Sequence, residues 1–255
     1  MSEATKVPGF AAPAGTWIAH AGVAHAGTTH AAAPAPAPAR PGPAVDDDLT
    51  ADLGDGVSLL FATPMLRLLM PDAARVNPGL RATILRRAQD DAGKAISNVG
   101  GWQSRNDLLD WDIPEAAQLK TWIAAAVRQM AQHSPMFRGR APGTTRFRAY
   151  AWANINRDGH YNRLHLHPGE HWSGVYYVDA GQPDPAIANN GVIEFLDPRP
   201  TARAMPVPGF KFDRGISIVP ASGMLLLFPS WLDHWVSPYQ GPGERISIAF
   251  NCTLE

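Results

Sequence analysis

The sequence of 255 residues has one cysteine, Cys252, so an intrachain disulfide and a zinc site of paired cysteines are both excluded. It has no run of about 18 apolar residues, so no membrane-spanning helix is predicted. It also has little net charge, because 22 basic residues balance 23 acidic ones. Non-specific nucleic-acid binding needs a clustered positive field, and this balance argues against that class of function.

The first part of the chain has little bulky apolar surface. Residues 1–45 are rich in Ala, Pro and Gly, with an alternating Ala-Pro run at 33–38. Such a composition cannot offset its ordering entropy, so we predict a disordered tail at 1–45 and a folded domain at 46–255. Lys6 is the only basic residue before the mildly apolar stretch that follows, which disfavours a signal peptide and indicates a cytoplasmic protein.

Two helices and one short strand are predicted at the start of the folded domain. Asn77 and Pro78 are typical of a helix N-terminus, and a second helix is predicted from a capping-box pattern at 112–115 to about His133. The segment 59–68 is predicted to form a strand interrupted by Pro64, and therefore an edge strand.

From Thr144 onward the hydrophobic period changes to two, which predicts strands. The predicted strands are 145–156, 161–167, 172–179, 191–196, 215–219, 223–228, 233–237 and 245–251. The 23 glycines and 24 prolines also favour many short strands over a helix bundle. The fold expected is therefore mainly β with flanking helices, arranged as a small antiparallel barrel or jelly roll.

Two histidines alternate along one predicted strand. His165 and His167 point to the same face, about 7 Å apart along the backbone, while Leu164 and Leu166 point to the other. Imidazoles at this spacing can converge on one metal ion, although a single histidine on a strand is more often structural. The pair followed by Pro168 therefore marks a candidate metal site.

A second group of candidate residues lies near the C-terminus. His234 stands eleven residues before Arg245, and Arg245 shares one face of the last predicted strand with Ser247. A guanidinium and a hydroxyl facing a dry interior suit a carboxylate ligand. The residues alone leave two alternatives open, a salt bridge on an edge strand for Arg245 and a solvent-facing loop for His234.

Together these motifs resemble those of the Fe(II)/2-oxoglutarate-dependent dioxygenases, and in particular a bacterial branch of 2OG-Fe(II) oxygenases. The shared motifs are His165-Leu166-His167-Pro168, Ser173-Gly174-Val175-Tyr176-Tyr177 and Phe228–His234. The resemblance implies a cupin-like double-stranded β-helix and an oxidoreductase that uses Fe(II), 2-oxoglutarate and O₂. It further implies hydroxylation of a C–H bond in a small molecule or peptide side chain, with release of succinate and CO₂.

The same resemblance implies roles for individual residues. His165 and His234 correspond to metal ligands, and Arg245 with Ser247 corresponds to the clamp on the far carboxylate of 2-oxoglutarate. Tyr176 falls where a related prolyl-hydroxylase motif places a tyrosine on that carboxylate.

The chain departs from the family pattern at the second metal ligand, which is usually acidic. His167 occupies that position here, so the third ligand is His167, water or the nearby Glu170. Strand alternation favours His167. Asp233, next to His234, is predicted to orient an imidazole.

Two other functions stay open at this point. A three-histidine iron site also occurs in cupin thiol dioxygenases, in which Arg245 would hold the substrate carboxylate. A non-catalytic barrel that binds a ligand or metal is the third hypothesis. Expected partners are a small-molecule or peptide substrate, with no nucleic acid and no membrane, and a homodimer is left open.

Overall fold

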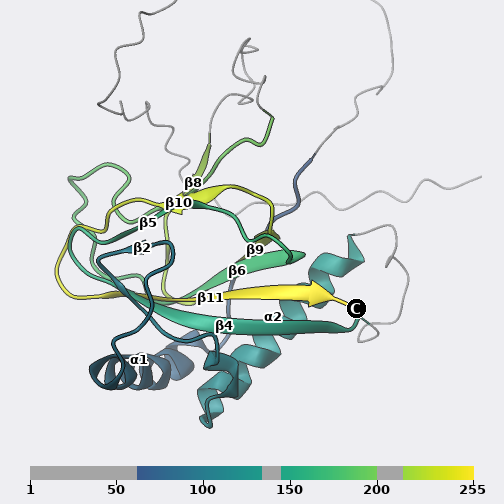
Figure 1. The fold of residues 1–255 in the computed structure, drawn as a ribbon, viewed down its shortest axis with the longest axis horizontal. Coiled ribbons are helices and arrows are strands. Elements are labelled where there is room, and N and C mark those ends of the chain that lie inside the picture. The colour runs from purple at the N-terminus through teal and green to yellow at the C-terminus, as the bar shows by residue number, and fades with distance from the viewer. Residues whose placement is uncertain (1–61, 134–144, 200–214) are drawn as a thin grey trace, which may run out of the picture. The chain divides into compact units, whose positions relative to one another are not determined.

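The computed structural model describes residues 62–133, 145–199 and 215–255 (Figure 1). The predicted tail at 1–45 lies outside these residues. The elements are β1 (Leu66–Leu69), α1 (Ala73–Asp90), β2 (Asn98–Val99), β3 (Trp102–Gln103), a 3₁₀ turn (Leu108–Asp110), α2 (Pro114–Gln132), β4 (Phe147–Asn156), β5 (Tyr161–His165), β6 (Trp172–Asp179), β7 (Ile193–Phe195), β8 (Ile216–Ile218), β9 (Met224–Pro229), β10 (His234–Val236) and β11 (Arg245–Leu254).

The strands form two antiparallel sheets. One sheet has six strands in the order β1-β9-β6-β11-β4-β3, and the other has five in the order β2-β5-β10-β7-β8. The two sheets lie as separate layers, and consecutive strands repeatedly change from one to the other (Figure 1). The predicted mainly β, jelly-roll fold is confirmed.

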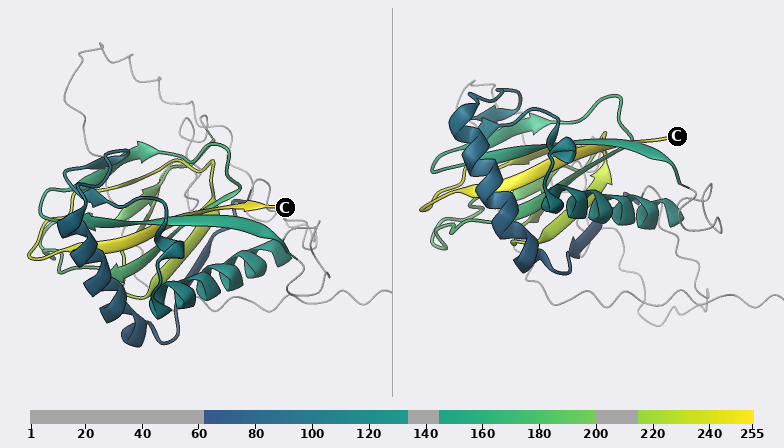
Figure 2. Two further views of the ribbon diagram at one scale, coloured as in Figure 1. Left: turned by 60° about the horizontal axis from the view of Figure 1, so that its bottom comes forward. Right: turned by 90° about the horizontal axis from the view of Figure 1, so that it is seen from below.

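The six-stranded sheet is covered by the two helices on one face and by the five-stranded sheet on the other. Its side chains point alternately to these two faces. On β11, Ile246, Ile248 and Phe250 pack in the apolar cluster that includes both helices. Figure 2 shows α1 and α2 across one face of this sheet. The alternate residues of β11 face the other sheet, so one strand contributes to the helix-packed core and to the space between the sheets.

Gly174 of β6 is required by the close packing at the centre of this sheet. A Cβ atom at this position would lie 2.2 Å from Cζ of Phe250 and 2.6 Å from the backbone oxygen of Leu226. The glycine of the Ser173–Tyr177 motif therefore has a packing function on the helix side of β6.

The first helix begins earlier than predicted. It starts at Ala73, after Asp72 in a left-handed backbone conformation, and Pro78 lies inside it. Asn77 does not cap the helix; its side-chain oxygen instead accepts a 2.5 Å hydrogen bond from the Tyr176 hydroxyl. The prediction from Asn77 was wrong because a tertiary contact uses the side chain that the local pattern assigned to a cap.

The second helix lies where it was predicted, whereas the edge strand covers only the end of the predicted segment 59–68, whose residues 59–61 lie outside the described residues. Helix α2 has Pro114 in its first turn and ends at Gln132, although its N-cap is Ile113 and no capping box forms. Strand β1 begins two residues after Pro64 and, among the strands that the structure describes, pairs with β9 alone, at the edge of the six-stranded sheet. None of the helices within the described residues is long and apolar enough to cross a membrane.

The packing of β11 predicts a large stability difference between two isoleucines. Ile248 is 0% exposed beneath the helices, whereas Ile216 of β8 is 52% exposed. We expect Ile248→Ala to lower the free energy of unfolding by about 2–5 kcal/mol, and the control Ile216→Ala to change it by about 0.5 kcal/mol or less. Urea unfolding measures both, and equal losses would contradict this description of the core.

Candidate functional site

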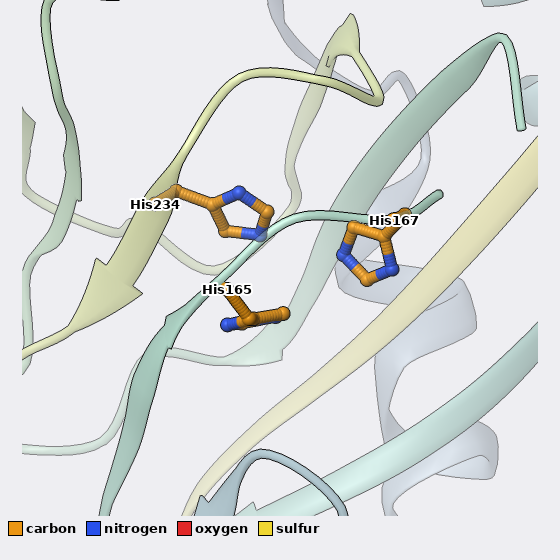
Figure 3. Close-up of side chains that lie close together, drawn as sticks. All are labelled: His165, His167 and His234. Carbon is orange, nitrogen blue, oxygen red and sulfur yellow. The ribbon is translucent and has the colours of Figure 1, made fainter. Parts of the chain in front are cut away.

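Two histidines of the five-stranded sheet and a third just beyond the end of β5 converge between the sheets. His165 ends β5, and it pairs in register with His234 at the start of β10. His167 lies two residues beyond the end of β5, where its N–H donates a 2.9 Å hydrogen bond to the Ser230 carbonyl. One nitrogen atom from each ring lies within 4.8 Å of the others, which is a spacing suited to a shared metal ion (Figure 3).

Two backbone carbonyls orient two of these rings. Nδ1 of His165 lies 2.6 Å from the Arg163 oxygen, and Nδ1 of His234 lies 2.8 Å from the Leu232 oxygen. A carbonyl can only accept, so each Nδ1 carries the proton and each Nε2 keeps its lone pair for a metal. Asp233 was predicted to orient an imidazole, and the structure assigns that task to these carbonyls instead.

Burial keeps the three imidazoles neutral. Burial, with a smaller contribution from the neighbouring His165, lowers the pKa of His234 to about 3 and that of His167 to about 4. Burial also lowers the pKa of His165. Near neutral pH, all three rings are therefore neutral, and none has to lose a net proton when a metal binds.

Glu170, one candidate for the third ligand, is held by other groups. Its carboxylate accepts hydrogen bonds from the hydroxyls of Tyr150 and Thr253, at 3.0 and 2.5 Å. It does not belong to the histidine cluster. A role as metal ligand would require Glu170 to leave both hydroxyls, so the donor set of this structure is three imidazoles.

The guanidinium of Arg245 is buried on the cavity face of β11. Arg245 is 2% exposed, its Cζ lies 5.2 Å from the ring centroid of Tyr177, and its Nε has no hydrogen-bond partner. No carboxylate within the described ranges forms an ion pair with it. The alternative of an edge-strand salt bridge is therefore wrong, since β11 is central and Arg245 faces inward.

Several buried polar atoms without partners surround the same space. They are Nε of Arg245, the Tyr177 hydroxyl and the side-chain oxygens of Asn154 and Asn156. Ser247 lies opposite Asn154 across β11 and β4 and is 5% exposed. Buried polar groups normally find partners, so this cluster is suited to a polar ligand that supplies them.

The three histidines and Arg245 line one cavity. Its lining comprises Ser97, Trp152, Asn154, Asn162, His165, His167, Gly174, Val175, Tyr177, Ile193, Phe228, His234, Val236, Arg245, Ser247 and Ala249. Of the predicted site residues, the structure brings together His165, His167, His234, Arg245 and Ser247.

Tyr176 is not part of this cavity. Its ring packs against Trp122 of α2, at a centroid distance of 5.3 Å, on the helix side of β6. The adjacent Tyr177 faces Arg245, because successive side chains of a strand alternate. The prediction for Tyr176 was therefore wrong by one residue, and Tyr177, Asn154 and Asn156 were missed. Asn154 and Asn156 are two residues apart in a predicted strand, so the sequence could have placed both amides on one face.

Comparisons with known proteins agree with this geometry. Residues 150–251 match the family described as "Putative 2OG-Fe(II) oxygenase". No curated protein matches the chain. Among solved structures, the chain is similar to the α-ketoglutarate-dependent epimerase SnoN of nogalamycin biosynthesis, at 13% identity and a TM-score of 0.53 over 75% of this chain and 78% of that one.

Two further structures are similar over three quarters of this chain. A prolyl-4-hydroxylase from Pseudomonas putida has 18% identity, a TM-score of 0.49 and 92% of its own length covered. HygX from Streptomyces hygroscopicus, solved with nickel, 2-oxoglutarate and hygromycin B, has 14% identity, a TM-score of 0.49 and 83% covered. At such identities the comparison with SnoN shows a shared fold and nothing more.

The neutral buried histidines predict a pH-dependent stability of the metal-free protein. Because the pKa of His234 falls from 6.5 to about 3 on folding, only the unfolded chain takes up a proton between these values. Stability is therefore full above pH 6.5 and is lost as the pH falls. Between pH 7 and pH 5, wild type should lose about 2 kcal/mol more than His234→Gln in urea unfolding with chelator present. Parallel losses would contradict a buried neutral His234.

Proposed function

We propose that this protein is an Fe(II)- and 2-oxoglutarate-dependent dioxygenase whose site is the cavity between the sheets, since residues 150–251 match the family described as "Putative 2OG-Fe(II) oxygenase". The observation that carries the proposal is a buried guanidinium without an acidic partner, in the same cavity as three neutral imidazoles. An unpaired buried cation is costly, and an anionic ligand removes that cost.

The metal is held by His165, His167 and His234. Imidazole nitrogens suit Fe(II), and three of them leave further coordination positions for the co-substrate and for O₂. The set carries no negative charge, unlike two histidines with one carboxylate. The negative charge at the metal is therefore supplied by 2-oxoglutarate itself.

The far carboxylate of 2-oxoglutarate binds at the Arg245 end of the cavity. The guanidinium offers a planar fork of donors, and Tyr177 and Ser247 add hydroxyl donors from the same face of the sheet. Burial raises the pKa of the Tyr177 hydroxyl, which therefore keeps its proton and can donate it. Tyr177 takes the role that was predicted for Tyr176.

The protein contributes orientation and exclusion of water. Bound iron would supply the chemistry in which O₂ oxidises 2-oxoglutarate to succinate and CO₂, with one oxygen atom entering succinate and the other the C–H bond of the substrate. Val175, Ile193 and Phe228 form an apolar wall beside the histidines, which keeps bulk water from the reacting centre. The substrate we propose is a small molecule or a peptide side chain, and hydroxylation is the outcome.

The metal assignment predicts the effect of removing one imidazole. We expect His234→Ala to abolish stoichiometric Fe(II) binding in an anaerobic titration, because His234 is buried with its Nε2 directed into the cluster. The control His133→Ala removes an exposed imidazole just after α2 and should leave the stoichiometry at the wild-type value. Unchanged iron affinity in His234→Ala would move the metal site elsewhere.

The carboxylate assignment predicts a loss of co-substrate affinity. Arg245→Lys keeps the positive charge but removes the planar fork. A hydrogen bond to a charged group contributes about 1.5–3 kcal/mol, so the KM for 2-oxoglutarate should rise roughly 10- to 100-fold. Succinate release measures this, with the exposed Arg67→Lys on β1 as control. If the KM of Arg245→Lys matched that of the control, the carboxylate would bind at another place.

A further inference from the structure

His167 differs from the other two histidines in the partner of its Nδ1. Within the described residues, this nitrogen contacts the side-chain nitrogen of Asn251, at 3.4 Å, rather than a carbonyl oxygen. Asn251 lies on the cavity face of β11 and is 3% exposed. An amide nitrogen can only donate, so the orientation of this amide determines what His167 can do.

A chain of hydrogen bonds fixes that orientation. The single proton of the Tyr150 hydroxyl is donated to a side-chain oxygen of Glu170. The Tyr150 oxygen must then accept, and the Asn251 nitrogen lies 2.9 Å from it. On its other side, the Asn251 oxygen accepts a 2.8 Å hydrogen bond from Ser173. The reversed amide would place two oxygens against each other at Tyr150.

This direction gives His167 the opposite tautomer to its neighbours. Its Nδ1 accepts from Asn251, so the neutral ring carries its proton on Nε2. His165 and His234 carry theirs on Nδ1. Figure 3 shows one nitrogen of the His167 ring directed towards the other two rings and one directed away. The inward nitrogen of His167 therefore bears a hydrogen while those of its neighbours bear lone pairs.

Ligation by His167 then requires the amide to turn. With its oxygen towards His167, Asn251 would accept a proton from Nδ1 and free the lone pair of Nε2. The Asn251 oxygen would then also face the Tyr150 hydroxyl, which would have to give up Glu170. Metal binding is thus linked to the hydrogen bond between Tyr150 and Glu170, which lies outside the metal site.

We propose that Asn251 is a positioning residue, whose amide, held by Tyr150 and Ser173, sets the tautomer of His167 and through it the Fe(II) affinity of the histidine cluster. The affinity part rests on the proposed metal site, whereas the tautomer belongs to the metal-free chain and is measured separately. Ser173 and Asn251 are buried and Tyr150 is half-buried, which strengthens the hydrogen bonds of the amide and leaves it few alternative partners.

The first test is a long-range ¹H–¹⁵N correlation spectrum of the full-length, metal-free protein near neutral pH. This spectrum distinguishes the two neutral tautomers of each histidine, and the signals lost in His165→Gln, His167→Gln and His234→Gln assign the three rings. We expect the proton on Nε2 in His167 and on Nδ1 in His165 and His234. A proton on Nδ1 of His167 would overturn the inference.

The second test uses two hydroxyls that bind the same carboxylate. Tyr150→Phe removes the group that locks Asn251, so the proton of His167 should shift towards Nδ1 and Fe(II) should bind about tenfold more tightly. The matched control Thr253→Val also removes a hydroxyl from Glu170 but leaves the Tyr150–Asn251 contact intact. It should keep the wild-type tautomer and an Fe(II) affinity within about twofold of wild type.

Equal effects of the two substitutions, or no effect of Tyr150→Phe on the tautomer, would contradict the role of Asn251. Failure of the wild-type chain to bind Fe(II) would instead count against the proposed function, and the tautomer spectrum would still decide whether Asn251 sets the state of His167.

Discussion

The buried guanidinium of Arg245 is the group on which the arrangement of the cavity depends. It lies on the central strand of the six-stranded sheet, is 2% exposed and has no acidic partner in the described part of the chain. Burial disfavours the charged form and lowers its pKa, so the folded protein bears a cost that an anionic ligand relieves. The unpartnered polar atoms of Tyr177, Asn154 and Asn156 lie around the same point.

The alternation of side chains on β11 links this site to the stability of the fold. Its apolar residues pack beneath α1 and α2, while Arg245, Ser247 and Asn251 face the cavity. Because β11 is packed on both faces, the positions of Arg245 and Ser247 in the cavity are fixed by the core. Substitutions on the helix side of β11 should therefore change the stability of the fold, whereas substitutions on the cavity side should change ligand binding.

The sequence predicted the strands well because period-two patterning and turn residues are local signals. The Arg245–Ser247 pair followed from the same alternation, whereas His167, predicted on the strand 161–167, lies beyond the end of β5, where its N–H bonds to the Ser230 carbonyl. The prediction that Tyr176 lines the cavity was wrong by one residue, because the sequence does not show which of the two adjacent tyrosines faces inward. The contact between Trp122 and Tyr176 places Tyr176 on the helix side of the sheet and Tyr177 on the cavity side. The start of α1 was missed because Asn77 binds Tyr176, 99 residues away in the chain.

Contacts between distant segments were beyond the reach of the sequence. The carbonyls that orient His165 and His234 are backbone groups, which no residue pattern reveals. The network from Asn251 through Tyr150 to Glu170 joins three strands or loops, and it explains why Glu170 is not with the histidines. The sequence thus indicated which residues carry chemistry, while their proton arrangement depends on tertiary structure.

The central claim is that one cavity binds a metal and 2-oxoglutarate together. Anaerobic calorimetric titration of the full chain with 2-oxoglutarate, with Fe(II) and then with chelator, tests it most directly. The structure predicts one equivalent of 2-oxoglutarate bound to the Fe(II)-loaded protein and much weaker binding after the metal is removed. Binding that is equally tight without metal, or absent in its presence, would contradict the claim.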